Sequence, residues 1–206
     1  MPDTPTALIA FNKPCGVISQ FSPHETHTSL KDYIDAPGYY PAGRLDTDSE
    51  GLLLLTCDGR LQARIAEPRH GKQKTYWAQV EGSPSDDRLA LLRQPMDLGD
   101  FITRPAQVRL LAPEETASLW PRTPPIRVRK SVPDFWLELR IHEGKNRQVR
   151  RMTARAGYPC LRHCHRPPRP SYAGSRPRPV AIHSAQPSVI ALARGQPLPA
   201  SRRQPL

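Results

Sequence analysis

One acidic residue of the chain, Asp46, occurs where a carboxylate could do chemistry. It ends the sequence Gly43-Arg44-Leu45-Asp46, which follows a turn and precedes the apolar run of residues 51–56. This placement predicts a carboxylate near the end of a sheet, with the guanidinium of Arg44 close in sequence. Such a carboxylate can act as a nucleophile or as a general base. Spacing alone equally allows Asp46 to form an ordinary structural ion pair.

Two further side chains have properties that suit the same kind of site. Tyr76 lies in the alternating stretch 75–81, where its ring could contact a ligand or simply fill the core. Arg150 lies in the predicted helix 146–156, where it could pair with a carboxylate or face solvent.

The charge of the chain predicts a polyanionic partner. Thirty lysines and arginines face nineteen acidic residues among 206 positions, which gives a formal net charge of +11. Much of the excess lies in residues 122–155 and in residues 164–206, and the second stretch holds seven arginines and no acidic residue. Clustered basic side chains favour nucleic acid over a small neutral substrate, although a plain solvated face is the alternative.

Composition argues against several classes of protein. No run approaches the ~18 apolar residues that a membrane span needs. The first five residues are neither basic nor apolar, so a secretion signal is not expected. Four cysteines are too few for a disulfide framework in a chain of this length. We therefore expect a cytoplasmic protein that does not interact with a membrane.

The elements that must position these residues mix strands and helices without strict alternation. Strands are expected at residues 8–11, 51–56, 75–81, 107–111 and 135–142, and helices at residues 30–34, 59–66, 83–92 and 146–156. Residues 135–142 alternate cleanly, so Leu139 and Ile141 should share one buried face. This mixture predicts an α+β fold with a mostly antiparallel central sheet and flanking helices.

Four stretches resemble, in the same order, the motifs of a known enzyme family. Residues 41–56 read PAGRLDTDSEGLLLLT, which closely resembles the catalytic motif of bacterial rRNA pseudouridine synthases of the small-subunit synthase A type. Residues 11–14 resemble the opening strand motif of this family, residues 74–76 its tyrosine motif and residues 143–152 its basic helix motif. Four motifs in the correct order are specific, and chance is a poor explanation for them.

Residues 119–131 are further similar to family members of the large-subunit type. This resemblance implies that large-subunit (23S) rRNA is the partner. Like those members, the chain begins almost directly at the catalytic domain, so a separate N-terminal RNA-binding module is not expected. Bodies of this size often work alone, and we expect a monomer.

The resemblance also implies a reaction and the residues that carry it. The family breaks the N-glycosidic bond of a uridine, rotates the base and rejoins it through C5, and no cofactor or metal is needed because substrate and product are isomers. Asp46 matches the essential aspartate, Tyr76 the tyrosine that stacks on the flipped base, and Arg150 the basic residue that pairs with the aspartate. Leu139 or Ile141 matches the apolar residue that packs by the base.

General physical arguments agree with these roles. A stacked uridine must be extruded at a cost of a few kcal/mol, and an aromatic platform such as Tyr76 would return about 1–3 kcal/mol of that. An ion pair from Arg150 would keep Asp46 ionised. Basic side chains in or near the motifs should bind phosphates and make RNA binding depend on salt. These are Arg44, Lys74, Lys145, Arg147, Arg151 and Arg155.

The similarity stops abruptly after residue 162. Family members continue with an apolar strand and a compact C-terminal segment, whereas residues 164–206 hold nine prolines and seven arginines. We predict a catalytic domain over residues 1–163 and a disordered tail over residues 164–206. The abrupt change favours a shift of the reading frame near residue 163, and a genuine basic tail is the alternative.

Other interpretations compete with that of an active enzyme. The chain could be a non-catalytic rRNA-binding or ribosome-assembly protein, or an enzyme made inactive by a damaged C-terminus. A general RNA chaperone would instead depend on residues 164–206. Cys160, His163, Cys164 and His165 have the chemistry of zinc ligands, but no second pair accompanies them, so no metal site is expected.

Overall fold

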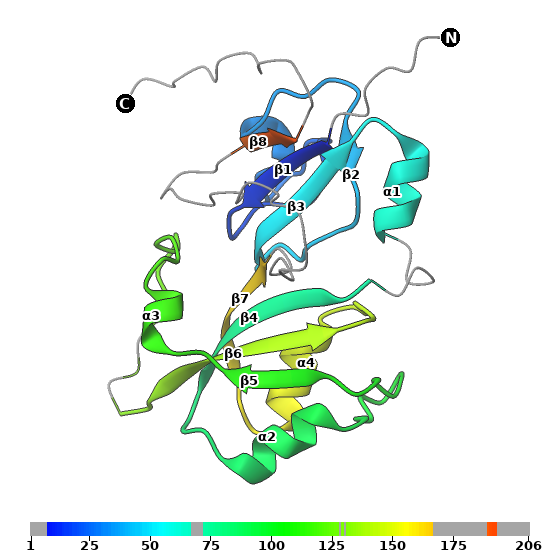
Figure 1. Cartoon of the computed structure of the whole chain (residues 1–206). Coiled ribbons are helices and arrows are strands. Elements are labelled where there is room, and N and C mark those ends of the chain that lie inside the picture. Colours follow the sequence, from blue (N-terminus) through cyan, green and yellow to red (C-terminus); the bar gives the residue numbers. More distant parts are fainter. Residues whose placement is uncertain (1–7, 67–71, 128, 130, 167–188, 193–206) are drawn as a thin grey trace.

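A computed structural model describes residues 8–66, 72–127, 129, 131–166 and 189–192 of the chain (Figure 1). The strands are β1 (Leu8–Lys13), β2 (Tyr40–Pro41), β3 (Glu50–Thr56), β4 (Lys74–Glu81), β5 (Gln107–Leu110), β6 (Asp134–Ile141), β7 (Cys160–Arg166) and β8 (Val189–Leu192). The helices are η1 (Leu30–Asp32, a 3-10 helix), α1 (Gly59–Ala66), α2 (Asp86–Arg93), α3 (Pro113–Thr116) and α4 (Gln148–Arg155). Across these described ranges, no helix is long and apolar enough to cross a membrane.

All these strands belong to one sheet. Its order is β5-β6-β4-β7-β3-β1-β8, and β2 pairs with β3 outside this path. Neighbouring strands are antiparallel except β3 and β7, which run parallel. Figure 1 shows an upper group of β1, β2, β3, β8 and α1 and a lower group of β4, β5, β6 and the other α-helices, with β7 reaching from one to the other. The predicted α+β fold with a mostly antiparallel sheet is confirmed.

The larger core lies in the lower group. β4 and β6 pair over their whole length, from Lys74 opposite Ile141 to Glu81 opposite Asp134. Every second side chain of these strands packs against α2 and α4, because the pleat of a strand sends alternate residues to one face. The larger core includes Tyr76, Ala78, Val80, Leu89, Leu92, Leu137, Leu139, Ile141, Val149, Met152 and Tyr158.

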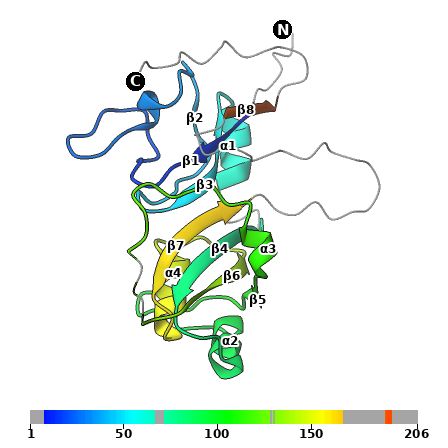
Figure 2. The same ribbon diagram turned by 90° about the vertical axis from the view of Figure 1, so that its left-hand side faces the viewer.

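A smaller core lies in the upper group. β1 pairs with β3 from Leu8 opposite Thr56 to Lys13 opposite Gly51, and apolar residues of both strands pack against the segment 17–34. The smaller core consists of Ile9, Phe11, Val17, Leu30, Ile34, Leu53 and Leu55. The turned view shows α1 and β8 beside β1 and β3, with β4, β6 and β7 below them (Figure 2). β3 and β7 join these two cores, and Trp77, Leu111 and Cys164 form a third, smaller cluster among the described residues.

Two helices begin later than the sequence predicted. α2 begins at Asp86, three residues after the predicted start, because Ser85 at its N-cap is extended. α4 begins at Gln148, because Arg147 before it adopts a left-handed conformation with φ of 49°. The second difference matters for function, since it directs the side chain of Arg147.

The predicted boundary between domain and tail at residue 163 falls within β7. β7 continues to Arg166, because Cys164 is fully buried against Trp77 and the strand pairs with β4. Residues 189–192 form β8, which pairs antiparallel with β1. These two stretches of the predicted tail belong to the sheet, and the rest of that tail lies outside the described residues.

Candidate active site

A cavity of about 950 Å³ lies between the larger and the smaller core. Loops of the upper group and the turn before α4 form most of its wall, while β4, β6 and β7 each contribute a side chain. The lining side chains with chemical potential include Asp46, Asp48, Tyr76, Ile141, Arg147 and His163. Its volume suits a small organic group such as a nucleotide.

Asp46 lies on a loop whose backbone is held at several points. The buried ammonium of Lys13 donates to the carbonyl of Thr47 at 3.4 Å, and the amide of Gly16 donates to the same carbonyl at 2.7 Å. The amide of Ser49 donates to the carbonyl of Asp46 at 3.0 Å. The carboxylate of Asp46, by contrast, accepts no hydrogen bond and forms no ion pair with any residue that the structure describes. The backbone around Asp46 is therefore held, and its carboxyl group lies on the cavity wall without a partner in the described ranges.

The neighbouring carboxylate, Asp48, has two arginine partners. Both terminal nitrogens of Arg147 donate to its oxygens at 3.0 Å. Nη2 of Arg150 lies 3.4 Å from Oδ2 of Asp48 and donates to its backbone carbonyl at 2.9 Å. Partial burial favours the neutral acid, but the hydrogen bonds from Arg147 and the charge of Arg150 outweigh it and lower the pKa of Asp48. The predicted pairing of Arg150 with Asp46 is corrected, because the turn of residues 46–49 presents Asp48 to α4.

Tyr76 forms part of both the larger core and the cavity wall. Its side chain is 8% exposed, and its ring stacks on that of His163 with centroids 4.9 Å apart. Burial raises the pKa of the Tyr76 phenol, and the negative charge of Asp46 raises it further. The phenol therefore stays protonated, and the electrostatic effect of Asp46 indicates that the two groups are close.

The two candidates for the apolar side of the pocket differ in position. Ile141, at the end of β6, lines the cavity. Leu139 is fully buried in the larger core, opposite Tyr76 in the β4–β6 register, and is not among the lining residues. The geometry therefore leaves Ile141 as the candidate for contact with a base, together with Val149 of α4.

Three of the cations predicted to bind phosphate lie at the cavity. Arg44, Lys145 and Arg147 all line it. Arg44 is exposed and has no ion-pair partner within the described ranges. Lys145 places its ammonium group 5.4 Å from the ring centre of Phe101. Arg147 is already neutralised by Asp48, so Arg44 and Lys145 have charge to spare for a phosphate.

The other three predicted cations lie outside the lining. Lys74 packs over Gly144, a residue of the cavity wall, and burial lowers the pKa of its ammonium group. Arg151 is bound to the carboxylate of Asp100. Arg155 is exposed in the last turn of α4. Because Arg155 lies outside the cavity lining, an RNA strand could contact it only along the exposed side of α4.

Sequence reasoning gave no role to Lys13 and His163, which the structure places at the site. Lys13 is fully buried, donates to the carbonyl of Val17 at 2.6 Å, and burial lowers the pKa of its ammonium to about 8. His163 is buried, and its Nδ1 lies 3.0 Å from Oγ of Ser49. A lysine within an apolar strand was a usable signal, because burying an ammonium is costly unless its donors are satisfied. The contact between His163 and Ser49 had no local signal.

The cysteines and histidines of β7 do not gather into a metal site. Successive residues of a strand face opposite sides, so Cys164 packs near Trp77 while His163 and His165 contact Tyr76 on the other face. Within the described part of the chain, no group of three or more His, Cys, Asp or Glu side chains could hold a metal ion.

The sequence and the fold have counterparts in known proteins. A family model described as RNA pseudouridylate synthase matches residues 7–155. The chain therefore belongs to the RNA pseudouridylate synthase family, which confirms the resemblance of its four motifs.

The relatives place the chain more closely within this family. It is 57% identical over 157 residues to the "Ribosomal large subunit pseudouridine synthase E" of Xanthomonas axonopodis pv. citri (strain 306), a match that covers 75% of this chain and 82% of the relative. It is 49% identical over 155 residues to the protein of the same name from Vibrio vulnificus (strain CMCP6), covering 75% of this chain and 65% of the relative. A solved structure titled "Crystal structure of pseudouridylate synthase" is similar with a TM-score of 0.62 and 25% identity, over 79% of this chain and 63% of that one.

Proposed function

We propose that this enzyme isomerises a uridine of large-subunit (23S) rRNA to pseudouridine, with Asp46 as its catalytic carboxylate. The observation that carries the assignment is the contrast between two carboxylates on one loop. Asp48 is bound by Arg147 and Arg150, whereas Asp46 lines the cavity with no partner in the described ranges. A carboxylate free of partners is available for nucleophilic or general-base work. The names of the relatives support the large-subunit substrate.

The reaction is an isomerisation. The bond between C1′ of the ribose and N1 of uracil breaks while Asp46 acts on the nucleotide. The base rotates, and a bond forms between C1′ and C5. The hydrogen on C5 leaves as a proton and N1 gains a proton, so the product has the composition of the substrate. No oxidant, reductant or cofactor enters this balance.

Base flipping brings the uridine to the cavity. A base within a stack is out of reach of a side chain on a protein surface, and extrusion costs a few kcal/mol. Tyr76 and Ile141 supply an aromatic and an aliphatic surface on the cavity wall beside Asp46. Stacking of this kind contributes about 1–3 kcal/mol per base, which offsets part of that cost.

Phosphate binding is assigned first to the unpaired cations of the cavity rim. Arg44 is exposed and Lys145 lies on the turn before α4. Lys74, Arg151 and Arg155 extend a basic surface from that rim. We further propose that the protein works as a monomer, and an rRNA substrate supports work in the cytoplasm.

Tritium release tests this function directly. Large-subunit rRNA carrying tritium at C5 of uridine should release tritium with the parent chain, because bond formation at C5 expels that hydrogen. Asp46→Asn should bind the same RNA without release, and equally labelled small-subunit rRNA should give little release. Equal turnover by Asp46→Asn and the parent would refute the role of Asp46. Binding without release by the parent would refute the enzymatic function of this chain.

A further inference from the structure

The side chain of Ser19 is hydrogen-bonded to both polar backbone groups of Leu45, the residue before Asp46. Its hydroxyl donates to the carbonyl of Leu45 at 2.8 Å and accepts the amide hydrogen of Leu45 at 3.0 Å. The directions of both bonds are fixed, because an amide can only donate and a carbonyl can only accept. Ser19 is buried and lines the cavity. Its one hydrogen is bound to Leu45, so Ser19 has no donor left for a substrate.

A second pair of contacts holds the loop on the other side of Asp46. The carbonyl of Thr47 accepts the amide of Gly16 at 2.7 Å and the ammonium of Lys13 at 3.4 Å. One stretch of the upper group therefore holds the residue before Asp46 and the residue after it. The two contacts at Thr47 support each other, whereas Ser19 alone supplies the side-chain contacts on the other side among the described residues.

The position of Asp46 depends on this backbone. Its carboxyl group accepts no hydrogen bond and forms no ion pair with any residue that the structure describes. No side chain in the described ranges therefore places the carboxyl group directly, and the backbone of the loop must do so. Leu45 also packs against the smaller core, so the loop has a polar and an apolar attachment to the upper group. Misplacement of a reacting group by about 1 Å can cost about a hundredfold in rate.

We propose that Ser19 is a positioning residue, which holds Asp46 in its reactive position through the backbone of Leu45. This inference rests on the proposed function and adds a residue that lies outside the four family motifs. Without the hydroxyl, the amide and the carbonyl of Leu45 lose their common partner, and the loop can move on one side of Asp46. Because Ser19 is bonded to the loop, its loss should slow the chemical step and leave RNA affinity unchanged.

Three variants separate this role from a structural one. Ser19→Ala removes only the hydroxyl, and we expect kcat for tritium release to fall about ten- to a hundredfold, with the Kd for large-subunit rRNA within about twofold of the parent value. Ser19→Thr keeps a hydroxyl on the same carbon and should recover most of the loss. Ser22→Ala makes the same change at an exposed serine nearby, outside the cavity lining, and should match the parent.

Hydrogen exchange at the amide of Leu45 supplies a readout that does not depend on activity. This amide is bonded to the hydroxyl of Ser19, so it should exchange about tenfold faster in Ser19→Ala than in the parent. The amide of Leu89 in α2, which is bonded to the carbonyl of Ser85 at 2.9 Å, should exchange equally in both proteins. Together these amides distinguish a local release of the loop from a general loss of stability.

The outcomes are distinct. An unchanged kcat in Ser19→Ala, or a lower kcat with unchanged exchange at Leu45, would overturn the inference while the proposed function stands. Weaker RNA binding at an unchanged kcat would assign Ser19 to the substrate and would overturn it as well. So would equal losses of kcat in Ser19→Ala and Ser19→Thr at the thermal midpoint of the parent. Absence of release by the parent would overturn the proposed function, and this inference with it.

Discussion

The lower and the upper group of the sheet differ in the extent of their strand pairing and in the size of their cores. In the lower group, β4 pairs over its full length with β6 and along most of it with β7, and the larger core fills one face. In the upper group, β1 and β3 enclose the smaller core with the segment 17–34. The lower group contributes Tyr76 and His163 to the cavity, and the upper group contributes Asp46. The geometry of the site therefore depends on how the two groups are joined.

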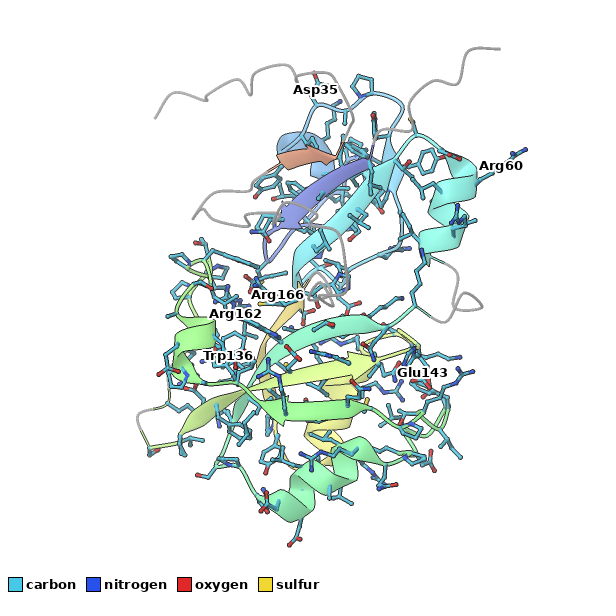
Figure 3. The ribbon with its side chains drawn as sticks, viewed as in Figure 1. Asp35, Arg60, Trp136, Glu143, Arg162 and Arg166 are labelled. Atoms are coloured by element: carbon cyan, nitrogen blue, oxygen red, sulfur yellow. The ribbon has the colours of Figure 1, made fainter. Side chains whose placement is uncertain are left out.

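The join is short and polar. β3 and β7 share two register pairs, Glu50 with Cys164 and Gly51 with His165. A Cβ on Gly51 would lie 2.2 Å from the carbonyl oxygen of His165, so only glycine permits this approach. Glu50 accepts hydrogen bonds from Arg162 at 3.1 and 2.9 Å. Figure 3 shows Arg162 and Arg166 of β7 at the level where the two groups meet. The join therefore combines a buried ion pair with a small apolar cluster, to which Cys164 and Trp77 belong.

Breaking this join should have the largest effect on stability. Glu50 is 1% exposed, and beside Arg162 it also faces Arg122 at 3.3 Å. Removal of one partner from a buried pair leaves an uncompensated charge, so Glu50→Gln should lower the free energy of unfolding by about 3–5 kcal/mol. Chemical denaturation measures this change. Glu81→Gln, which removes the partner of the exposed Arg129, should cost at most about 1 kcal/mol, and equal losses would contradict the contrast.

β7 shows why part of the fold could not be predicted from the sequence. Residues 160–166 read CLRHCHR, which looks exposed by composition. Each buried polar side chain has a partner more than a hundred residues away: Arg162 binds Glu50 and His163 binds Ser49. No local pattern can report such pairs. β4 and β6 were predictable because their alternation is a local signal. The start of α1 also has a local cause, since Asp58 accepts the amide of Arg60 at 2.8 Å.

The site was predictable to a similar degree. The motif around Asp46 and the ring of Tyr76 both lie on the cavity wall. The partner of Arg150 did not follow from the sequence, because it depends on the tight turn that presents Asp48. The binding of Arg147 to Asp48 depends likewise on a left-handed φ of 49°, an unusual conformation for a residue other than glycine. Exact dihedral angles, not residue types, decided these contacts.

A shift of the reading frame near residue 163 stays a prediction. The arginine-rich and proline-rich composition of residues 164–206 motivates it. Resequencing of the locus checks it, and a single uninterrupted frame through residue 206 would refute it.

Acid should lower the free energy of unfolding through His163 of β7, by less than the loss expected for Glu50→Gln. Burial lowers the pKa of His163 from 6.5 to about 3, so the unfolded chain binds a proton between these values and the folded chain does not. The free energy of unfolding should therefore fall as pH drops from about 6.5 toward 3, by about 2 kcal/mol between pH 7 and pH 5 from this residue. His163→Phe keeps an aromatic ring but cannot titrate, so denaturation at several pH values should show a shallower acid limb. Parallel curves for the two proteins would contradict the burial of a neutral imidazole.

The smallest expected effect is on the salt dependence of RNA binding, where one basic residue of each group is compared. Arg44 of the upper group has no ion-pair partner in the described ranges, whereas Arg151 of the lower group is bound to Asp100. Arg44→Gln should reduce the slope of log affinity against log salt by about one on large-subunit rRNA, because one phosphate contact is lost. Arg151→Gln should change the slope less. Filter binding over a salt series measures both, and the reverse order would contradict the assignment of Arg44.

In the proposed mechanism Asp46 acts on the nucleotide, whereas Asp48 binds Arg147 and Arg150. Single-turnover tritium release by Asp46→Asn and Asp48→Asn, on large-subunit rRNA labelled at C5 of uridine, tests it most directly. We expect no release by Asp46→Asn and a reduced but measurable release by Asp48→Asn, with RNA bound by both. Release by Asp46→Asn together with its loss in Asp48→Asn would contradict the claim and assign the catalytic role to Asp48.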